Sequence, residues 1–367
     1  MFDYKHYVSV LRWKAAEKEA LEKLSDKEKK YLTPLIELIM PQPVAFRTGE
    51  GEVKIIKTHE ELLNESIEKL KSKIPGIPEE ILKFWGTAPI FIDLSLIDFS
   101  LRVNGLEDIL STGIDMGLYL IPVVTLASDN DLKKVATLHA QKSKQGICLR
   151  LFRSDFKPSL GDDVKSFLTN QGLLANQVDL IIDFQITDSK CLEIKDFIKQ
   201  IPSISDWRTF TVISGTFPKD LMEFTVDMHF KERSDWNCWL EQINSGDLLR
   251  KPAFGDYTIQ HPIYLEPSPG SNPSASIRYT LPDKWMIMRG QGLRGENSAG
   301  HAQYPAQAHL LLEQKEFFGA GFSFGDAYIA RIGSDITTKE TGNPRTWLRA
   351  GINHHLACVI SQVSNLP

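Results

Sequence analysis

Short apolar runs rich in β-branched residues alternate with charged segments of helical spacing through roughly the first 260 residues, and this alternation constrains the fold most. The eight runs lie at residues 7–11, 32–38, 89–94, 118–125, 146–152, 178–184, 209–214 and 253–259. Residues 178–184 are apolar on both faces of a strand, which is typical of a parallel sheet covered by helices. Eight strand–helix units spaced by about 30 residues predict an α/β fold, a closed (β/α)8 barrel of the TIM type.

An open doubly wound sheet is the competing architecture. Such sheets often have fewer strands and a glycine-rich phosphate turn after the first strand. Here the first run continues into Leu11-Arg12-Trp13-Lys14, which contains no glycine. We therefore favour the barrel.

The pattern changes after residue 262. A loop rich in Pro, Ser, Gly and Asn leads into a predicted hairpin at residues 276–290, with its turn at Pro282-Asp283. A final helix is predicted at residues 344–363, because Asn343 can cap it and Pro344 suits the first helical position. We thus expect a barrel over 1–262, a β-rich insertion over its C-terminal face at 263–342, and a final helix at 343–367 that closes the barrel.

Composition excludes several classes of protein. A formal net charge of −5 over 367 residues argues against a generally basic, nucleic-acid-coating protein. No apolar run approaches the roughly 20 residues that span a bilayer, and the first residues do not resemble a signal peptide. Cys148, Cys191, Cys238 and Cys358 lie far apart, and most of them within apolar segments. We therefore expect buried, reduced thiols in a cytoplasmic protein.

Acidic and basic residues fall where the barrel strands end. Because the C-terminal strand ends of such barrels open onto the active site, these side chains are the candidate site. The catalytic candidates are Glu37, Asp93 and Asp183, and the candidate anion-binding residues beside them are Arg12, Lys14 and Arg150. Carboxylate oxygens suit a divalent cation such as magnesium, although the sequence establishes no cofactor and assigns no metal ligands. The alternative is structural: the acids pair with Arg12 or Arg150 inside the barrel.

The final helix carries a second group of polar residues. Arg345 and Arg349 share one face near its N-terminus, where an anion is favoured. His354 and His355 are adjacent and therefore point about 100° apart around the helix, which disfavours a shared metal. We expect a structural role for at least one of these histidines.

Basic and aromatic residues are interleaved in the hairpin and beyond it. They are Arg278, Tyr279, Trp285, Arg289 and Trp347. Such a surface is expected to bind a protein partner, and a nucleotide or single-stranded nucleic acid is the alternative ligand.

Several segments resemble the Beta protein family of satellite phages and prophages. They are residues 7–14 (YVSVLRWK), 33–37 (TPLIE), 276–280 (SIRYT), 289–290 (RG), 324–326 (FGD), 342–343 (GN) and 353–355 (NHH), with Trp347. The resemblance implies a protein of mobile-element loci, linked to defence against competing phages and accompanied by a protein partner from the same locus. It supplies no catalytic mechanism.

Two functions follow as hypotheses. The first is a protein of anti-phage defence or inter-phage exclusion that senses or restrains a partner. The second is a metal-assisted hydrolase of phosphate esters or nucleic acid that uses the strand-end carboxylates. The sequence does not decide whether the protein is an enzyme, nor what its oligomeric state is.

Overall fold

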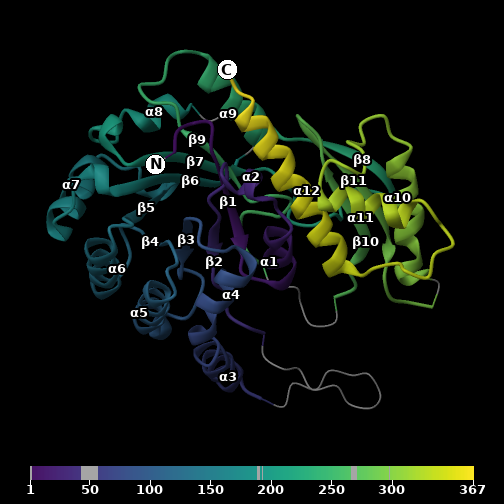
Figure 1. The fold of residues 1–367 in the computed structure, drawn as a ribbon, viewed down its shortest axis with the longest axis horizontal. Helices are drawn as coiled ribbons and strands as arrows, with labels where there is room; N and C mark the ends of the chain where they lie inside the picture. Colours follow the sequence, from purple (N-terminus) through teal and green to yellow (C-terminus); the bar gives the residue numbers. More distant parts are fainter. Residues whose placement is uncertain (1, 43–56, 188–190, 192, 266–270, 297) are drawn as a thin grey trace.

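The computed structural model of the protein describes residues 2–42, 57–187, 191, 193–265, 271–296 and 298–367. The chain forms a closed barrel of eight parallel strands and, beside it, a three-stranded antiparallel sheet (Figure 1). Each of the eight predicted runs contributes one barrel strand, so the predicted fold class is confirmed. The barrel strands are β1 (Tyr7–Arg12), β2 (Leu35–Glu37), β3 (Ile90–Asp93), β4 (Leu120–Val124), β5 (Ile147–Phe152), β6 (Val178–Ile186), β7 (Thr209–Gly215) and β9 (Ala253–Asp256).

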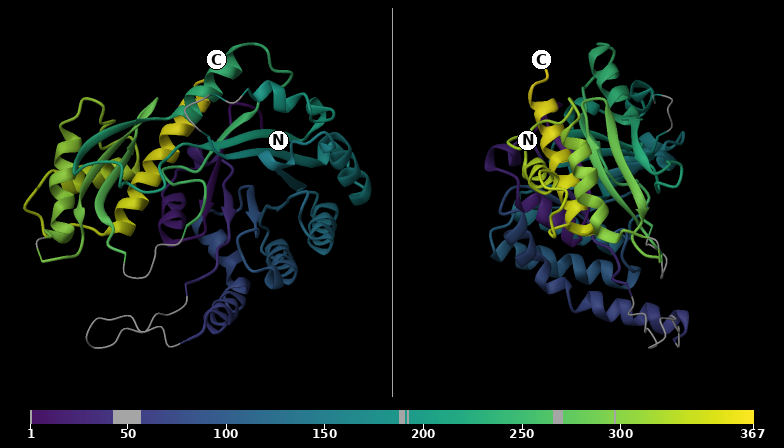
Figure 2. Two further views of the ribbon diagram at one scale, coloured as in Figure 1. Left: turned by 180° about the vertical axis from the view of Figure 1, so that it is seen from behind. Right: turned by 90° about the vertical axis from the view of Figure 1, so that its right-hand side faces the viewer.

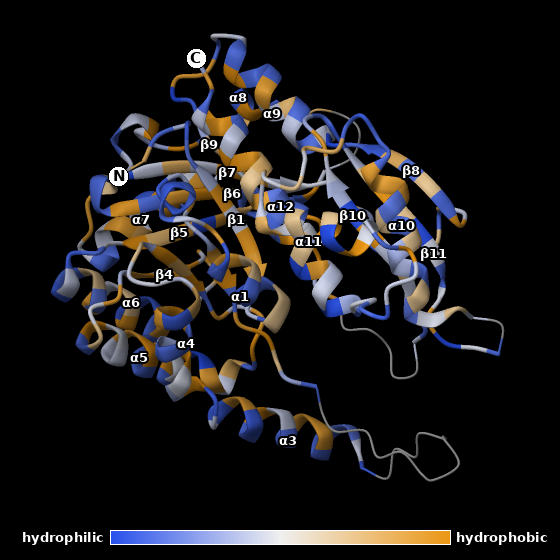
Figure 3. Cartoon of the chain, turned by 45° about the vertical axis from the view of Figure 1, so that its right-hand side comes forward, coloured by the Kyte–Doolittle hydropathy of each residue, from blue (hydrophilic) through white to orange (hydrophobic). Residues whose placement is uncertain are grey.

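Helices cover the outside of the barrel. Hydropathy colouring shows the apolar strands within a shell of helices whose outer faces are more polar (Figure 3). These helices are α1 (Ala15–Glu22), α2 (Asp26–Lys29), α3 (His59–Lys71), α4 (Ile77–Phe84), α5 (Phe99–Asp115), α6 (Asn130–Ser143), α7 (Leu160–Gln171), α8 (Ile194–Ile198) and α9 (Ser234–Asn244).

Two apolar layers line the strands because successive side chains of a strand point to opposite faces. Val8, Val10, Leu35, Phe91 and Ile181 belong to a buried cluster that fills the barrel interior. A larger cluster lies between the strands and the helices. The interior is therefore a packed core rather than a channel.

The second sheet has the strand order β10-β11-β8. Its strands are β8 (Asp227–Glu232), β10 (Ser274–Thr280) and β11 (Lys284–Gly292), and two helices pack on it, α10 (Gln303–Leu312) and α11 (Phe324–Gly333). Strand β8 lies within the range 1–262 that the sequence assigns to the barrel. It belongs to the connection between β7 and α9, and it pairs with β11 rather than with a barrel strand.

The last helix, α12 (Pro344–Ser364), lies between the barrel and this sheet (Figures 1 and 2). Ile352, Leu356 and Val359 pack into the core of the barrel wall, whereas Trp347 and Ala350 belong to the cluster beneath the sheet. The helix packs on α1 and β1, so two segments far apart in the sequence lie side by side.

Two glycines allow the close approach of α12 to its neighbours. A Cβ atom on Gly351 would lie 2.8 Å from the carbonyl oxygen of Arg278 in β10. A Cβ atom on Gly325 of α11 would meet the backbone of Ala350. Larger side chains at these positions would force the elements apart.

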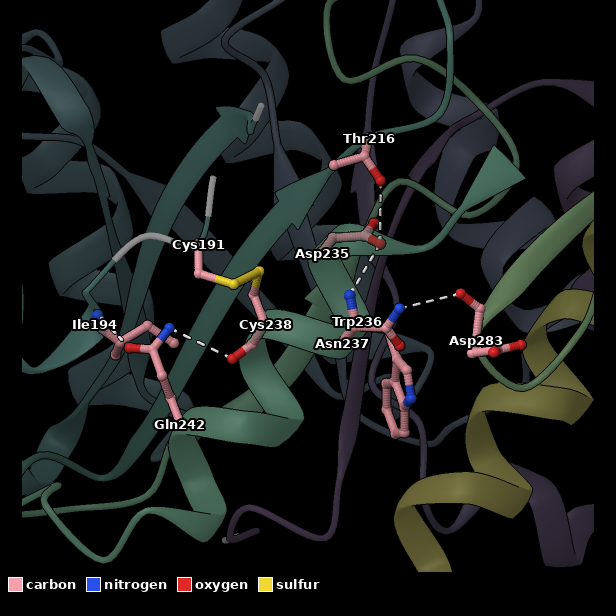
Figure 4. The surroundings of a disulfide bond; sticks show 9 residues. All are labelled: Cys191, Ile194, Thr216, Asp235, Trp236, Asn237, Cys238, Gln242 and Asp283. Atoms are coloured by element: carbon pink, nitrogen blue, oxygen red, sulfur yellow. Dashed lines mark hydrogen bonds between the residues drawn. A yellow bond between two sulfur atoms is a disulfide. The ribbon is translucent and has the colours of Figure 1, made fainter. Parts of the chain in front are cut away.

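A disulfide joins Cys191 to Cys238 and so ties the segment before α8 to α9 (Figure 4). The expectation of four reduced thiols is therefore wrong for this pair. The two residues are 47 positions apart, and only the packing of α9 beside that segment brings them together. Cys148 and Cys358 are buried free thiols, in agreement with the expectation.

Within the described ranges, none of the helices has both the length and the apolar character needed to cross a membrane.

Candidate functional site

The predicted acidic residues converge on one arginine inside the barrel. Arg150 donates from Nη1 to Glu37 Oε1 at 2.9 Å and to Asp93 Oδ2 at 2.6 Å. Its Nε donates to Asp183 Oδ2 at 2.9 Å. Tyr257 completes the group, because its hydroxyl accepts from Arg150 Nη2 at 3.0 Å and donates to Asp183 at 2.6 Å. We call these five residues the Arg150 clamp.

Strand register explains why the clamp forms. Glu37 and Asp93 are the last residues of β2 and β3 and pair directly with each other. Arg12, the last residue of β1, pairs with Glu37 on the other side. The ends of parallel strands meet in one layer, so the side chains that point into the barrel from these ends come together above the apolar interior. Arg150 and Asp183 reach this layer from β5 and β6.

The clamp is buried, and its three carboxyl groups share the single cation of Arg150. Glu37, Asp93 and Asp183 are 4%, 2% and 0% exposed, and Arg150 is 1% exposed. Burial raises the pKa of Glu37, and Arg150 and Arg12 only partly oppose this effect. Burial alone would lower the pKa of Arg150, but Asp183 and the other acidic neighbours hold it well above its usual value.

Arg12 extends the clamp toward the C-terminal mouth. Its Nε lies 3.3 Å from Glu37 Oε2, and its guanidinium lies over the ring of Tyr257. Nη2 donates to the carbonyl oxygen of Pro262, which belongs to the segment after β9. Lys14 donates to the hydroxyl of Tyr264 in the same segment at 2.7 Å. Residues that follow β9 therefore cover the mouth on this side.

This geometry matches the structural alternative more closely than the catalytic one. The carboxylates are oriented by Arg150 and lie out of contact with solvent, and a catalytic acid must reach its substrate. Among the described residues, no group of three His, Cys, Asp or Glu side chains is placed to hold a metal ion. A catalytic role for Glu37, Asp93 and Asp183 stays a prediction.

The two arginines predicted to bind an anion on the last helix do contact a carboxylate, that of Glu19 in α1. Arg349 Nη1 lies 3.2 Å from Glu19 Oε2, and Arg345 pairs with the other oxygen. The anion is thus part of the same chain, and the pairs hold the start of α12 against α1. Nothing in the sequence specified Glu19, because the contact depends on how the two helices pack.

The predicted aromatic partner surface is wrong for its three aromatic residues. Tyr279 and Trp285 are fully buried, and Trp347 is 2% exposed. Both faces of the hairpin are covered: one packs on α10, α11 and α12, and Trp285 on the other contacts Phe217 after β7. The consecutive apolar residues Trp-Met-Ile-Met at 285–288 are the sequence signal for a strand buried on both faces.

The two basic residues of that surface are only half-buried. Arg278 donates to the carbonyl oxygen of Ile259 at 2.9 Å and lies over the ring of Phe217. It therefore joins the sheet to the segments that follow β7 and β9. Arg289 lies in β11 opposite Asp227 of β8.

His354 and His355 belong to a buried network that sequence reasoning did not find. His354 contacts Asp326 Oδ2 through Nδ1 at 2.8 Å and the Thr280 carbonyl through Nε2 at 2.7 Å. Tyr279 donates to the other oxygen of Asp326 at 2.7 Å. Carbonyl and carboxylate oxygens both accept hydrogen bonds, so each ring nitrogen of His354 faces an acceptor.

The neighbouring histidine extends this network into the barrel. His355 Nε2 lies 2.9 Å from Asp256 Oδ2, and its Nδ1 lies 2.8 Å from Thr280 Oγ1. Burial lowers the pKa of His355, so a neutral ring donates to Asp256 and accepts from the threonine hydroxyl. The order Asp–His–Thr resembles a nucleophilic triad, but Asp256, His355 and Thr280 are at most 1% exposed. The triad therefore joins α12, the barrel and the sheet.

These features define the class of protein: an α/β protein with a closed (β/α)8 barrel, a C-terminal antiparallel sheet and a buried ionic clamp at the strand ends. The chain belongs to the Beta protein family, whose sequence model matches residues 7–361.

Solved barrels provide the structural comparison. A mutant tryptophan synthase alpha-subunit from Pyrococcus furiosus is 11% identical with a TM-score of 0.41, over 70% of this chain and 89% of that chain. A type I 3-dehydroquinate dehydratase from Clostridium difficile is 13% identical with a TM-score of 0.36, over 71% of this chain and 87% of that chain. None of the curated proteins matches the sequence.

Proposed function

We propose that this Beta protein acts in anti-phage defence or inter-phage exclusion by binding a protein partner, which it senses or restrains. The family resemblance supports the part of this proposal that concerns defence or exclusion. The observation that carries the binding role is the unpaired edge of β8, together with exposed apolar residues on this strand and in the segment before it. Within the part of the chain that the structure describes, β8 pairs on one side only, with β11.

The residues around this edge are unusually apolar for a free surface. Met222, Val226 and Phe230 are 78%, 57% and 45% exposed. We call them the β8 edge surface. An unpaired strand edge offers backbone N–H and C=O groups to an extended segment of another protein, and apolar side chains beside it add affinity.

The charges of β8 fit a specific partner better than random association. Asp227, Lys231 and Glu232 lie on the strand itself. Such charges protect an edge from indiscriminate pairing, because a partner strand must supply complementary charges. The proposed occupant is therefore an extended segment of a protein encoded in the same locus.

A plaque assay tests this proposal. Bacteria that express the chain with its neighbouring genes are challenged with competing phages, and Met222→Asp, Val226→Asp and Phe230→Asp variants are compared with the parent. Loss of one central apolar contact weakens a protein interface by about 2 kcal/mol or more, so protection should fall at least about tenfold. Leu249→Asp, at a residue 73% exposed outside this surface, is the matched control.

Two results would contradict the proposal. The first is full protection by all three β8 variants, and the second is a parent chain that gives no protection against any phage tested. Thermal unfolding must show that the variants retain the stability of the parent, which is expected because these side chains face solvent.

The hydrolase hypothesis keeps one specific observation in its favour. Glu37, Asp93 and Asp183 lie in one layer at the strand ends, as a carboxylate site requires. Turnover of a phosphate diester or monoester with magnesium, lost in Glu37→Gln and Asp183→Asn, would support it. Absence of turnover across the panel would refute it.

We also place the protein in the cytoplasm, where its phage targets replicate. Its disulfide is of a kind that is rare in that compartment. Trapping thiols with an alkylating reagent in intact cells shows whether Cys191 and Cys238 are paired there, and a fully oxidised pair in every growth condition would argue against this location.

A further inference from the structure

A cavity of about 620 Å³ opens at the N-terminal end of the barrel, opposite the Arg150 clamp. Its walls come from residues that precede or begin the strands, among them Thr33 before β2, Pro89 before β3, Tyr119 before β4 and Thr209 at the start of β7. Cavities of this size hold small organic ligands. The proposed partner surface and the predicted catalytic residues make no use of it.

The floor of the cavity is a fixed and self-neutralised ion pair. Arg208 donates from Nε to Asp179 Oδ1 at 2.8 Å, and its Nη2 pairs with the other oxygen. Thr209 donates to the same carboxylate at 2.7 Å. Because Asp179 is fully engaged, it is not free to bind a metal or a ligand cation.

The rim carries an excess of positive charge. Lys29 and Lys30 lie there with Asp26, which leaves one net positive charge beyond the neutral floor. Lys29 is held in place, since its Nζ donates to the carbonyl oxygen of Trp85 at 3.2 Å. Lys30 is exposed and has no ion-pair partner among the residues that the structure describes. The rim therefore favours an anion.

The walls between floor and rim are aromatic. Phe2 stacks on His6 with ring centroids 4.1 Å apart, and Tyr119 lies half-buried in the same cavity. His6 contributes a neutral ring: burial lowers its pKa to about 3, and Nε2 is hydrogen-bonded to Thr33 Oγ1 at 2.9 Å. Flat neutral rings around a space of this size suit a heteroaromatic ligand.

From the cationic rim and the aromatic walls, we propose that this cavity binds a mononucleotide, with the base among Phe2, His6 and Tyr119 and the phosphate at Lys29 and Lys30. A free phosphate ion would fill only a small part of the cavity and contact no ring. An uncharged nucleoside would leave the net positive charge of the rim uncompensated. The lining therefore fits a ligand that carries both an aromatic ring and an anionic group.

Calorimetric titration of the full chain with adenosine monophosphate tests this inference. We expect saturable binding at one site, weakened about tenfold for adenosine and for inorganic phosphate, each of which lacks one element. Lys29→Ala and Lys30→Ala should each weaken the nucleotide several-fold. Lys27→Ala, on the same helix α2 but outside the cavity lining, should leave binding unchanged.

A second variant examines the ring contact separately. Tyr119→Leu keeps an apolar side chain, so the fold is retained while the stacking surface is lost, and adenosine monophosphate should bind several-fold more weakly. Absence of nucleotide binding would overturn the inference. Equal affinity for inorganic phosphate and the nucleotide, or an effect of Lys27→Ala as large as that of Lys30→Ala, would also overturn it.

Discussion

Replacing Arg150 with methionine is the most direct test of the clamp. The substitution keeps an unbranched apolar stem but removes the cation that Glu37, Asp93 and Asp183 share. Arg12 still lies 3.3 Å from Glu37, whereas the two aspartates keep no cation within ion-pair distance among the residues that the structure describes. Breaking a buried ion pair by removing one partner costs about 3–5 kcal/mol, and we expect the free energy of unfolding to fall by that amount at neutral pH.

The loss of stability in Arg150→Met should depend on pH, and the pKa of Glu37 determines whether it grows or shrinks as the pH rises. Burial raises the pKa of Glu37 in the folded protein, while Arg150 is the strongest influence that lowers it. Without Arg150 the folded pKa rises further above the unfolded one. A raised carboxyl pKa stabilises the fold at low pH, and this contribution is lost as the pH rises through the folded pKa. The deficit of Arg150→Met should therefore be larger at pH 8 than at pH 5.

Urea unfolding, followed by tryptophan fluorescence at both pH values, measures this difference. Arg150→Lys is the matched control, because it keeps the charge but not the forked geometry, and its deficit should be smaller. A loss below about 1 kcal/mol, the size of an ordinary surface change, would refute the assigned role. So would equal deficits of Arg150→Met at the two pH values.

Three further predictions concern other parts of the fold. Trp285→Ala should lower the free energy of unfolding by about 3–5 kcal/mol in calorimetry, because this side chain is fully buried, and a loss like that of a surface variant would contradict its core position. Cys191→Ser should lower the free energy of unfolding, measured with urea, by about 2–4 kcal/mol. A reductant should lower the free energy of unfolding of the parent by the same amount and leave that of the variant unchanged. Burial raises the pKa of Asp235 to about 6, so its carboxyl stabilises the fold at low pH and loses that contribution as the pH rises toward 6. Asp235→Asn should thus match the parent near pH 4 and exceed its stability by roughly 2–3 kcal/mol at pH 8, whereas equal stabilities at both pH values would contradict the shift.

The barrel was predictable because its strands are buried on both sides. Each run is apolar enough to stand out against the charged helical segments, and their spacing specifies the architecture. Strand β8 was not predicted. Its sequence, DMHFKE, is a short segment in which single apolar residues stand between polar ones, which is a weak strand signal. Its strand conformation depends on pairing with β11.

The candidate site was predictable in its membership but not in its interactions. Parallel strand ends meet in one layer, so Glu37 and Asp93 had to come close together. That Arg150 reaches them from across the barrel depends on side-chain length and rotamer, which a sequence pattern does not contain. Trp285 and Tyr279 were misplaced for a similar reason, because alternation along a strand does not tell whether both of its faces are covered.

The position of α12 has a consequence for how the protein is made. Its residues leave the ribosome after all the other described elements, yet they cover the wall formed by β1 and α1, which emerge before the rest of those elements. Until then the surfaces of β1 and α1 on which α12 packs have no cover from this helix. A chain that ends before residue 344 therefore leaves this apolar seam uncovered, and uncovered apolar surfaces of this kind are prone to aggregation.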